Sequence, residues 1–185
     1  GIYLVPGENR FYLAVHRHPD GNVAGRLADR NPVQLIVRPD IEDRNFHHTT
    51  KAYTGPEQLW PEAVTVERCG FAFAPHESHR LIVEIDPGEF ISEPEWRYQV
   101  HRPLEAERGL DPDSDLFSPG YFSVELSGGN TAVLTARATT QTEKESATPL
   151  PLNNQISTWF DKTPRYLEMV EALQQAMNHY LVKRS

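Results

Sequence analysis

The chain has 185 residues, a length that suits one domain with an appendage, and its 18 basic and 26 acidic side chains give a formal net charge of −8. This balance disfavours nucleic acids and anionic membranes as partners, because no basic surface dominates. Hydrophobic residues make up 38% of the chain, enough for a sizeable core. No apolar run approaches the ~20 residues of a membrane span, and the first residues lack the hydrophobic region of a signal peptide. We therefore expect a cytoplasmic globular protein, and its single cysteine excludes an internal disulfide.

Short segments of alternating apolar and polar residues recur along most of the chain, as they do in half-buried strands. In chain order they are residues 11–16, 33–37, 63–66, 81–85, 96–100, 121–126 and 131–136. Turn residues such as Pro19-Asp20-Gly21-Asn22 lie between them, and the 15 prolines disfavour long helices. This pattern predicts a mostly β protein, with an antiparallel β-sandwich over residues 1–138.

The composition changes after residue 138. Residues 139–151 contain few apolar side chains and are expected to form a linker. Within residues 152–185, Thr163-Pro164 is a typical helix start. An apolar stripe at helical spacing follows it, formed by Tyr166, Val170, Leu173, Met177 and Leu181. We expect a C-terminal linker helix whose stripe contacts another domain.

Both ends of the chain favour a fragment of a longer protein. Residues 1–5 have the pattern of a strand already in progress, and the expected last helix continues to Ser185 without a glycine cap. We therefore expect the sandwich to be incomplete at its N-terminus. A self-contained domain with abrupt ends is the alternative interpretation.

Two polar motifs resemble metal sites. His47 and His48 are adjacent, and Glu42 or Asp43 could supply a third ligand, but neighbouring side chains in a strand point to opposite faces. We therefore expect no metal there; one ring should be buried with a hydrogen bond, while the other faces solvent or a partner domain.

The second motif, Asp111-Pro112-Asp113-Ser114-Asp115, resembles the start of a calcium-binding loop. Such a loop needs glycine at its sixth position and glutamate at its twelfth, where this chain has Leu116 and Phe122. The sequence therefore predicts an acidic turn whose side chains cap nearby backbone amides.

Catalytic patterns are absent from the sequence. Glu105 and Glu107 are two residues apart and need not converge as the carboxylate pair of a glycosidase does, so we favour an ion pair with Arg102 or Arg108. There is no G-x-S-x-G motif, no glycine-rich phosphate loop and no catalytic context around Cys69. We therefore expect no catalytic residue, metal or cofactor in this chain.

Two blocks of sequence resemble the N-terminal domain of the bacterial and archaeal glycogen debranching enzyme family, of the amylo-α-1,6-glucosidase type. Residues 35–47, LIVRPDIEDRNFH, are similar to the L-R-P-L…R-D-x-H segment of that family. The more specific block is LEAERGLD at 104–111, followed by DLFSPG at 115–120 and a strand at 122–126. The sequence YLVKR at 180–184 resembles the F-L-V-R-R that opens the catalytic domain of the family.

The resemblance implies a supersandwich-like β domain, related to that of bacterial glucoamylases, joined to a C-terminal (α/α)6 barrel. In this family the barrel carries the acidic catalytic residues and hydrolyses α-1,6 branch points of glycogen. No catalytic residue of the family lies in the matched region, so none is assigned to this chain. The chain would then be a non-catalytic domain that packs against the barrel.

Contact with α-glucan is a further expectation. The candidate residues lie in loops or beside polar segments: Phe46, His47, His48, Tyr53, Trp60, Trp96 and Tyr98. Flat aromatic side chains can stack on sugars, but they are also ordinary core residues, and the core role is the default for these aromatics. Two alternatives stay open for the whole chain, a stand-alone carbohydrate-binding sandwich and a structural or interaction module.

Overall fold

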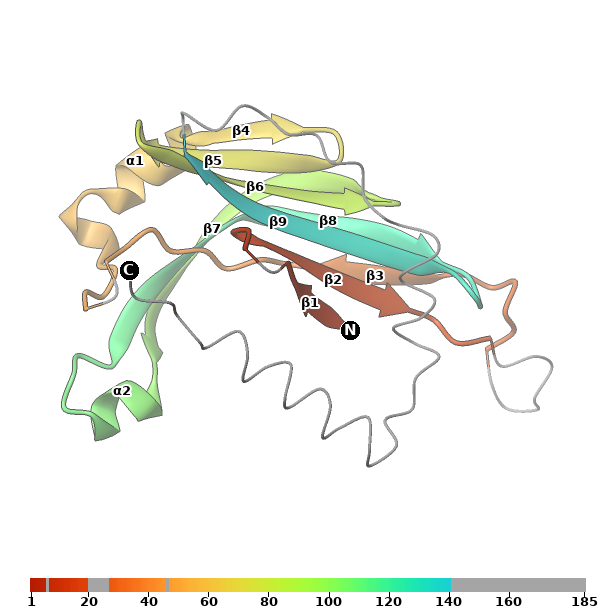
Figure 1. Cartoon of the computed structure of the whole chain (residues 1–185), viewed down its shortest axis with the longest axis horizontal. Coiled ribbons are helices and arrows are strands. Elements are labelled where there is room, and N and C mark those ends of the chain that lie inside the picture. Colours follow the sequence, from red (N-terminus) through yellow and green to blue (C-terminus); the bar gives the residue numbers. More distant parts are fainter. Residues whose placement is uncertain (6, 20–26, 46, 141–185) are drawn as a thin grey trace.

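The computed structural model describes residues 1–5, 7–19, 27–45 and 47–140 (Figure 1). Over these residues the chain forms a six-stranded sheet, in the order β1-β2-β9-β6-β5-β4, and a three-stranded sheet, in the order β3-β8-β7. All pairs of neighbouring strands are antiparallel. The mostly β, antiparallel fold predicted from the sequence is therefore confirmed. Phe46, nearly all of the expected linker and the whole C-terminal stripe from Tyr166 to Leu181 lie outside the described residues.

The large sheet consists of β1 (Ile2–Leu4), β2 (Arg10–His16), β9 (Thr131–Thr140), β6 (His79–Asp86), β5 (Gly70–His76) and β4 (Val64–Glu67). The small sheet consists of β3 (Val33–Val37), β8 (Asp113–Leu126) and β7 (Glu89–His101). The helical elements are the 3₁₀ turn η1 (Ala52–Thr54), α1 (Pro56–Glu62) and α2 (Pro103–Glu107). Among the described residues, none of these helices is long and apolar enough to span a membrane.

The core lies between the inner faces of the two sheets. Phe71 of the large sheet packs against Phe90 of the small sheet, with ring centroids 4.9 Å apart, and Phe90 is 5.1 Å from Phe122. Phe122 has no exposed surface. Aromatic side chains bury large apolar areas, so this cluster supplies much of the hydrophobic stabilisation of the sandwich.

Some elements differ from the sequence-based expectations. Residues 33–37 form β3 as expected, but β7 and β8 are longer than predicted and β5 was not predicted. The two short α-helices were also missed, and β9 includes Thr139 and Thr140, the first two residues of the expected linker. Pro75 in β5 and Pro94 in β7 interrupt the local strand pattern, and tertiary pairing overrides that signal.

The hairpin of β7 and β8 continues beyond the sandwich, and α2 lies at its tip (Figure 1). Gly120 lies where this extension begins: a Cβ there would be 2.1 Å from the carbonyl oxygen of Ile91 on the paired strand. Only glycine can therefore occupy this position with the strands so close. Beside it the register of β7 shifts between Ser92 and Glu95.

The outer edge of β8 is covered along its length by one segment. β3 pairs with β8 up to Val37, and the chain then continues along the same edge, where Ile41 forms a bridge with Phe117. Residues 42–45 and 47–49, called here the loop at 42–49, lie away from β8, and the chain returns to it at Thr50, whose carbonyl oxygen accepts a hydrogen bond of 2.8 Å from Asp115 N. The loop at 42–49 is thus anchored to β8 on both sides.

β1 is an edge strand of the large sheet, and its apolar side chains are exposed. Ile2 and Leu4 pair with Leu13 and Phe11 of β2, which pack against the core, so these side chains belong to the inner face of the sheet. Ile2 is nonetheless 74% exposed and Leu4 is 72% exposed. Apolar side chains of the inner face are therefore accessible at the β1 edge of the six-stranded sheet.

Candidate functional site

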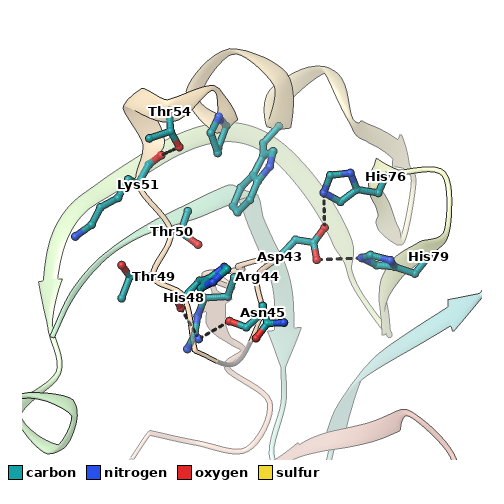
Figure 2. A pocket seen from close by; sticks show the side chains of 12 residues that line it. Asp43, Arg44, Asn45, His48, Thr49, Thr50, Lys51, Thr54, His76 and His79 are labelled. Carbon is teal, nitrogen blue, oxygen red and sulfur yellow. Dashed lines mark hydrogen bonds and ion pairs between the residues drawn. The ribbon is translucent and has the colours of Figure 1, made fainter. Parts of the chain in front are cut away.

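A pocket of about 520 Å³ lies between the loop at 42–49, the start of α1 and the turn that joins β5 to β6. Figure 2 shows how side chains from these elements surround it. The lining residues are Asp43, Arg44, Asn45, His48, Thr49, Thr50, Lys51, Thr54, Pro56, Trp60, His76 and His79. They come from segments far apart in the chain, so only the folded domain assembles this site.

Asp43 lies between two histidines of the β5–β6 turn (Figure 2). His79 Nε2 is 3.0 Å from Asp43 Oδ1, a hydrogen-bond distance, and His76 Nε2 is 3.7 Å from Asp43 Oδ2. His76 and His79 are the paired residues that close the hairpin, so the turn itself places both rings toward the carboxylate. The contact connects the loop at 42–49 to the large sheet.

Trp60 of α1 lines the pocket and belongs to an aromatic cluster of the core. Trp60 stacks on Trp96 with ring centroids 5.4 Å apart, and its edge also meets the ring of Phe73 at 5.3 Å. Trp60 is only 5% exposed, and Trp96 packs against the same core. These two candidate glucan contacts are therefore core residues first, as the default interpretation expected, and Trp60 in addition lines the pocket.

A polar network fixes the base of the loop at 42–49. Ser114 Oγ donates a hydrogen bond of 2.5 Å to Glu42 Oε1, and Arg102 pairs with Glu42 Oε2. Burial alone would raise the pKa of Glu42, but the hydrogen bonds from Ser114 and Arg102 and the charge of Arg102 outweigh it, so the pKa lies below its ordinary value. Glu42 is thus held as a carboxylate.

Asp115 organises the neighbouring backbone. Its Oδ2 accepts a hydrogen bond of 2.7 Å from Ala52 N, and its Oδ1 accepts one of 2.8 Å from Gln99 N. Gln99 has φ of 54°, in the left-handed region that non-glycine residues rarely adopt. Asp115 is buried, so both of its oxygens are used to hold η1 and the bulge of β7 in place.

A smaller hollow of about 80 Å³ lies on the side of the loop that faces α2. It shares Arg44, His48 and Thr49 with the larger pocket, so the two adjoin. Lys51 Nζ is 2.9 Å from Asp111 Oδ2 at this end of the site. That hydrogen bond from Lys51, followed by one from the backbone of Asp113, lowers the pKa of Asp111.

The remaining candidate glucan contacts lie at the same end of the molecule. Tyr53 is 80% exposed, and Tyr98 is 55% exposed with its hydroxyl donating to Glu57 Oε1 at 2.5 Å. His47 and His48 are both exposed, so the expectation that one ring is buried was wrong. These two residues lie in a turn and its continuation, outside any strand, and alternation between faces does not apply to them.

The acidic segment at 111–115 caps backbone amides as predicted, but the expected turn is wrong, because residues 113–115 belong to strand β8. Asp111 Oδ1 accepts a hydrogen bond from Asp113 N, and Asp115 caps the amides of Ala52 and Gln99. The expected ion pair of Glu105 is formed with Arg108, at 3.2 Å. Across residues 1–5, 7–19, 27–45 and 47–140, no group of three or more His, Cys, Asp or Glu side chains is placed to hold a metal ion.

Sequence reasoning missed most of the pocket. Of its lining residues only His48 and Trp60 were candidates for glucan contact, whereas Thr50, His76 and His79 were not considered. The available signal was the pair of histidines three residues apart around a hairpin turn, which places two rings at one end of the sheet. Their partner Asp43 lies more than thirty residues earlier, and nothing in the local pattern connects them.

Comparison with known proteins supplies one match. The family model described as "Glycogen debranching enzyme N terminal" matches residues 2–133, well over half of the chain. The matched range contains every residue of the pocket and of its polar network. No significant similarity links the chain to a curated protein or to a solved structure.

Proposed function

Since this chain belongs to the glycogen debranching enzyme N-terminal family, we propose that it is the non-catalytic β domain of a glycoside hydrolase that cleaves α-1,6 branch points of glycogen. The family match over residues 2–133 is the observation that carries this proposal. The partner would be a catalytic (α/α)6 domain of the same parent protein. The apolar stripe from Tyr166 to Leu181 is proposed as a contact with that domain.

The electrostatics of the described site support a non-catalytic role. The general acid of a glycosidase needs a raised carboxyl pKa, so that it carries a proton at working pH. The two carboxyl groups of this region whose pKa is clearly displaced, Glu42 and Asp111, are both shifted downward by their hydrogen bonds. Asp43 Oδ1 is paired with His79, and Asp115 is paired with two backbone amides, so these contacts connect segments of the fold.

We also propose that the end of the domain around the loop at 42–49 contributes to glucan binding by the parent enzyme. Support comes from the clustering of candidates distant in sequence: His48 and Trp60 line one pocket, and Tyr98 stacks beside Trp96 with centroids 6.4 Å apart. Binding energy gathered on such a surface would help to orient a branch at the catalytic carboxylates.

The experiment compares three proteins on a limit dextrin that retains α-1,6 branches: the parent enzyme, the parent lacking residues 1–140, and the present chain alone. We expect activity in the parent, a loss of at least about tenfold in the truncated form, and none in the chain alone. Hydrolysis by the isolated chain would contradict a non-catalytic role. Full activity of the truncated parent would contradict a supporting role.

Exposed side chains are the appropriate probes of glucan contact, because Trp60 and Trp96 cannot be removed without disturbing the core. Tyr53→Ala in the parent should raise the KM for glycogen several-fold and leave the melting temperature unchanged, since Tyr53 is 80% exposed. Leu59→Ala is a matched control, because Leu59 lies on the nearby helix α1 and is 64% exposed. Equal KM values for both variants and the unmodified parent would contradict a contact at Tyr53.

A further inference from the structure

We propose that the pocket around Asp43 is a binding site for a single pyranose unit of an α-glucan. The proposal deepens the proposed function and rests on it for the identity of the sugar. The volume of the pocket, about 520 Å³, falls within the ~300–1,000 Å³ of typical small-molecule sites. The residues that carry the argument are Asp43, Thr50, His76, His79, Pro56 and Trp60.

Two buried polar atoms of the lining residues lack hydrogen-bond partners in the protein. Thr50 is only 5% exposed, and its Oγ1 makes no hydrogen bond of good geometry, although the hydroxyl is near enough to the Glu42 carboxylate to contribute to the lowered pKa of Glu42. Asp43 Oδ2 is also buried and unpartnered, because His76 Nε2 lies 3.7 Å away, beyond hydrogen-bond distance. Leaving buried polar groups unpaired is unfavourable, so both atoms gain if a ligand completes their hydrogen bonding.

The chemistry of these two atoms selects the ligand. A carboxylate oxygen only accepts hydrogen bonds and repels anions, which argues against a phosphate or carboxylate ligand beside Asp43. A threonine hydroxyl both donates and accepts. A ligand hydroxyl can therefore donate to Asp43 Oδ2, and it or a neighbouring hydroxyl can pair with Thr50 Oγ1. A neutral molecule with several adjacent hydroxyl groups satisfies both requirements.

The apolar part of the lining fits the same ligand class. Pro56 and Trp60 also line the pocket, and they offer C–H and aromatic surface to the apolar face of a sugar ring. Trp60 is fixed by its stacking on Trp96 and its edge contact with Phe73. A wall that is already rigid loses little entropy when a ligand binds.

The site also allows the sugar to be part of a chain. The adjoining hollow of about 80 Å³ shares Arg44, His48 and Thr49 with the pocket. The openings on the two sides of the loop at 42–49 therefore give a neighbouring unit a path along the surface. This arrangement favours a linear maltooligosaccharide segment over an isolated monosaccharide.

The test uses the whole 185-residue chain and maltoheptaose, titrated by calorimetry, with the melting temperature of each variant measured in parallel. Thr50→Val removes the hydroxyl, which makes no hydrogen bond of good geometry, and keeps the shape of the side chain. We expect the affinity of Thr50→Val for maltoheptaose to fall at least about tenfold while its melting temperature stays the same or rises. His76→Ala, at an exposed ring, should weaken binding by a smaller factor. Thr65→Val on β4 is the matched control and should bind as the unmodified chain does.

Three results would overturn the proposal: no binding of maltoheptaose by the unmodified chain, equal affinities of Thr50→Val and Thr65→Val, or displacement of maltoheptaose by inorganic phosphate. A fall in the melting temperature of Thr50→Val would also oppose it, because the hydroxyl would then have a partner within the protein. These outcomes are independent of the truncation experiment on the parent enzyme. Failure of the sugar site therefore leaves the supporting role standing, and failure of the supporting role leaves the sugar site standing.

Discussion

The two halves of the β7–β8 hairpin are stabilised in different ways. At its base, Phe90 and Phe122 pair across the strands and pack on Phe71 of the opposite sheet. Beyond Gly120, one side of the hairpin meets the segment at 41–52, which is held by the carboxylates of Glu42 and Asp115. The difference teaches that this chain relies on apolar burial where two sheets face each other. Beyond Gly120 apolar packing continues, because Trp96 and Phe117 pack with Trp60, and hydrogen bonds to the carboxylates of Glu42 and Asp115 are added to it.

The largest loss of stability is expected at the base. Phe122→Ala should lower the free energy of unfolding by about 3–5 kcal/mol, because it removes a fully buried ring and leaves a cavity between the sheets. Urea unfolding followed by tryptophan fluorescence measures this change. Ile36→Ala on the neighbouring strand β3 is the control, and it should cost less than about 1 kcal/mol because Ile36 is half exposed. Similar losses of unfolding free energy in Phe122→Ala and Ile36→Ala would mean that Phe122 does not lie at the centre of the hydrophobic core.

The next largest effect is expected at the polar end. Asp115→Ala leaves the buried amide of Ala52 and the amide of Gln99 without acceptors, and should cost about 2–3 kcal/mol. Asp115→Asn retains one acceptor oxygen and should recover part of that loss. Hydrogen exchange should show faster exchange at Ala52 and Gln99 and unchanged protection in β5 and β6. Equal loss of protection at Ala52 and Gln99 and in β5 and β6 would show that the base of the hairpin and its extension do not unfold separately.

Glu42 makes the stability of the extended part of the hairpin sensitive to acid, because it connects the segment at 41–52 to Ser114 and Arg102. A carboxylate whose folded pKa is lowered adds stability that is present above its unfolded pKa and is lost as the pH falls through the folded pKa. Glu42→Gln should therefore cost about 1–2 kcal/mol at neutral pH, and the difference from the unmodified chain should shrink as the solution becomes acidic. Unfolding curves over a range of pH measure this difference, and a gap that stays constant would contradict the assigned role.

The smallest effect should be a gain. Gln99 holds a left-handed backbone with φ of 54°, and its side chain is exposed. Gln99→Gly should therefore raise stability by about 0.5–1 kcal/mol, because glycine adopts this conformation without strain. Gln99→Ala keeps the Cβ and should leave stability unchanged. A loss of stability in the glycine variant would show that the bulge depends on the side chain of Gln99.

Local patterns in the sequence predicted the sandwich better than they predicted its extension. Alternation identified β3, where Leu35 and Val37 face the core while Gln34 and Ile36 point outward. It failed in β8 at 113–120, where Ser114, Asp115 and Ser118 are buried, because the hydrogen-bond partners of Ser114 and Asp115 come from neighbouring segments. A buried polar strand has no signal in a single sequence, since its stability depends on partners such as Thr50 and Ala52.

The same limit applies to the candidate site. Aromatic content drew attention to Trp60, which does line the pocket, because large flat side chains can be recognised without knowing their neighbours. The role of Asp43 could not be predicted, because it depends on the turn that brings His76 and His79 to it. The unpartnered Oγ1 of Thr50 is visible only after every neighbouring donor and acceptor has been placed.

The position of β9 in the large sheet has a consequence for synthesis of the chain. β9 lies between β2 and β6 and pairs with both, although β2 precedes it by more than one hundred residues. As the chain leaves the ribosome, β1 and β2 can pair only with each other, and they cannot join the rest of the large sheet until residues 131–140 emerge. Pairing so distant in sequence slows folding and leaves the first strands open to wrong partners in the meantime. A nascent or recombinant chain that stops before Thr131 therefore contains two separate groups of strands and no complete large sheet.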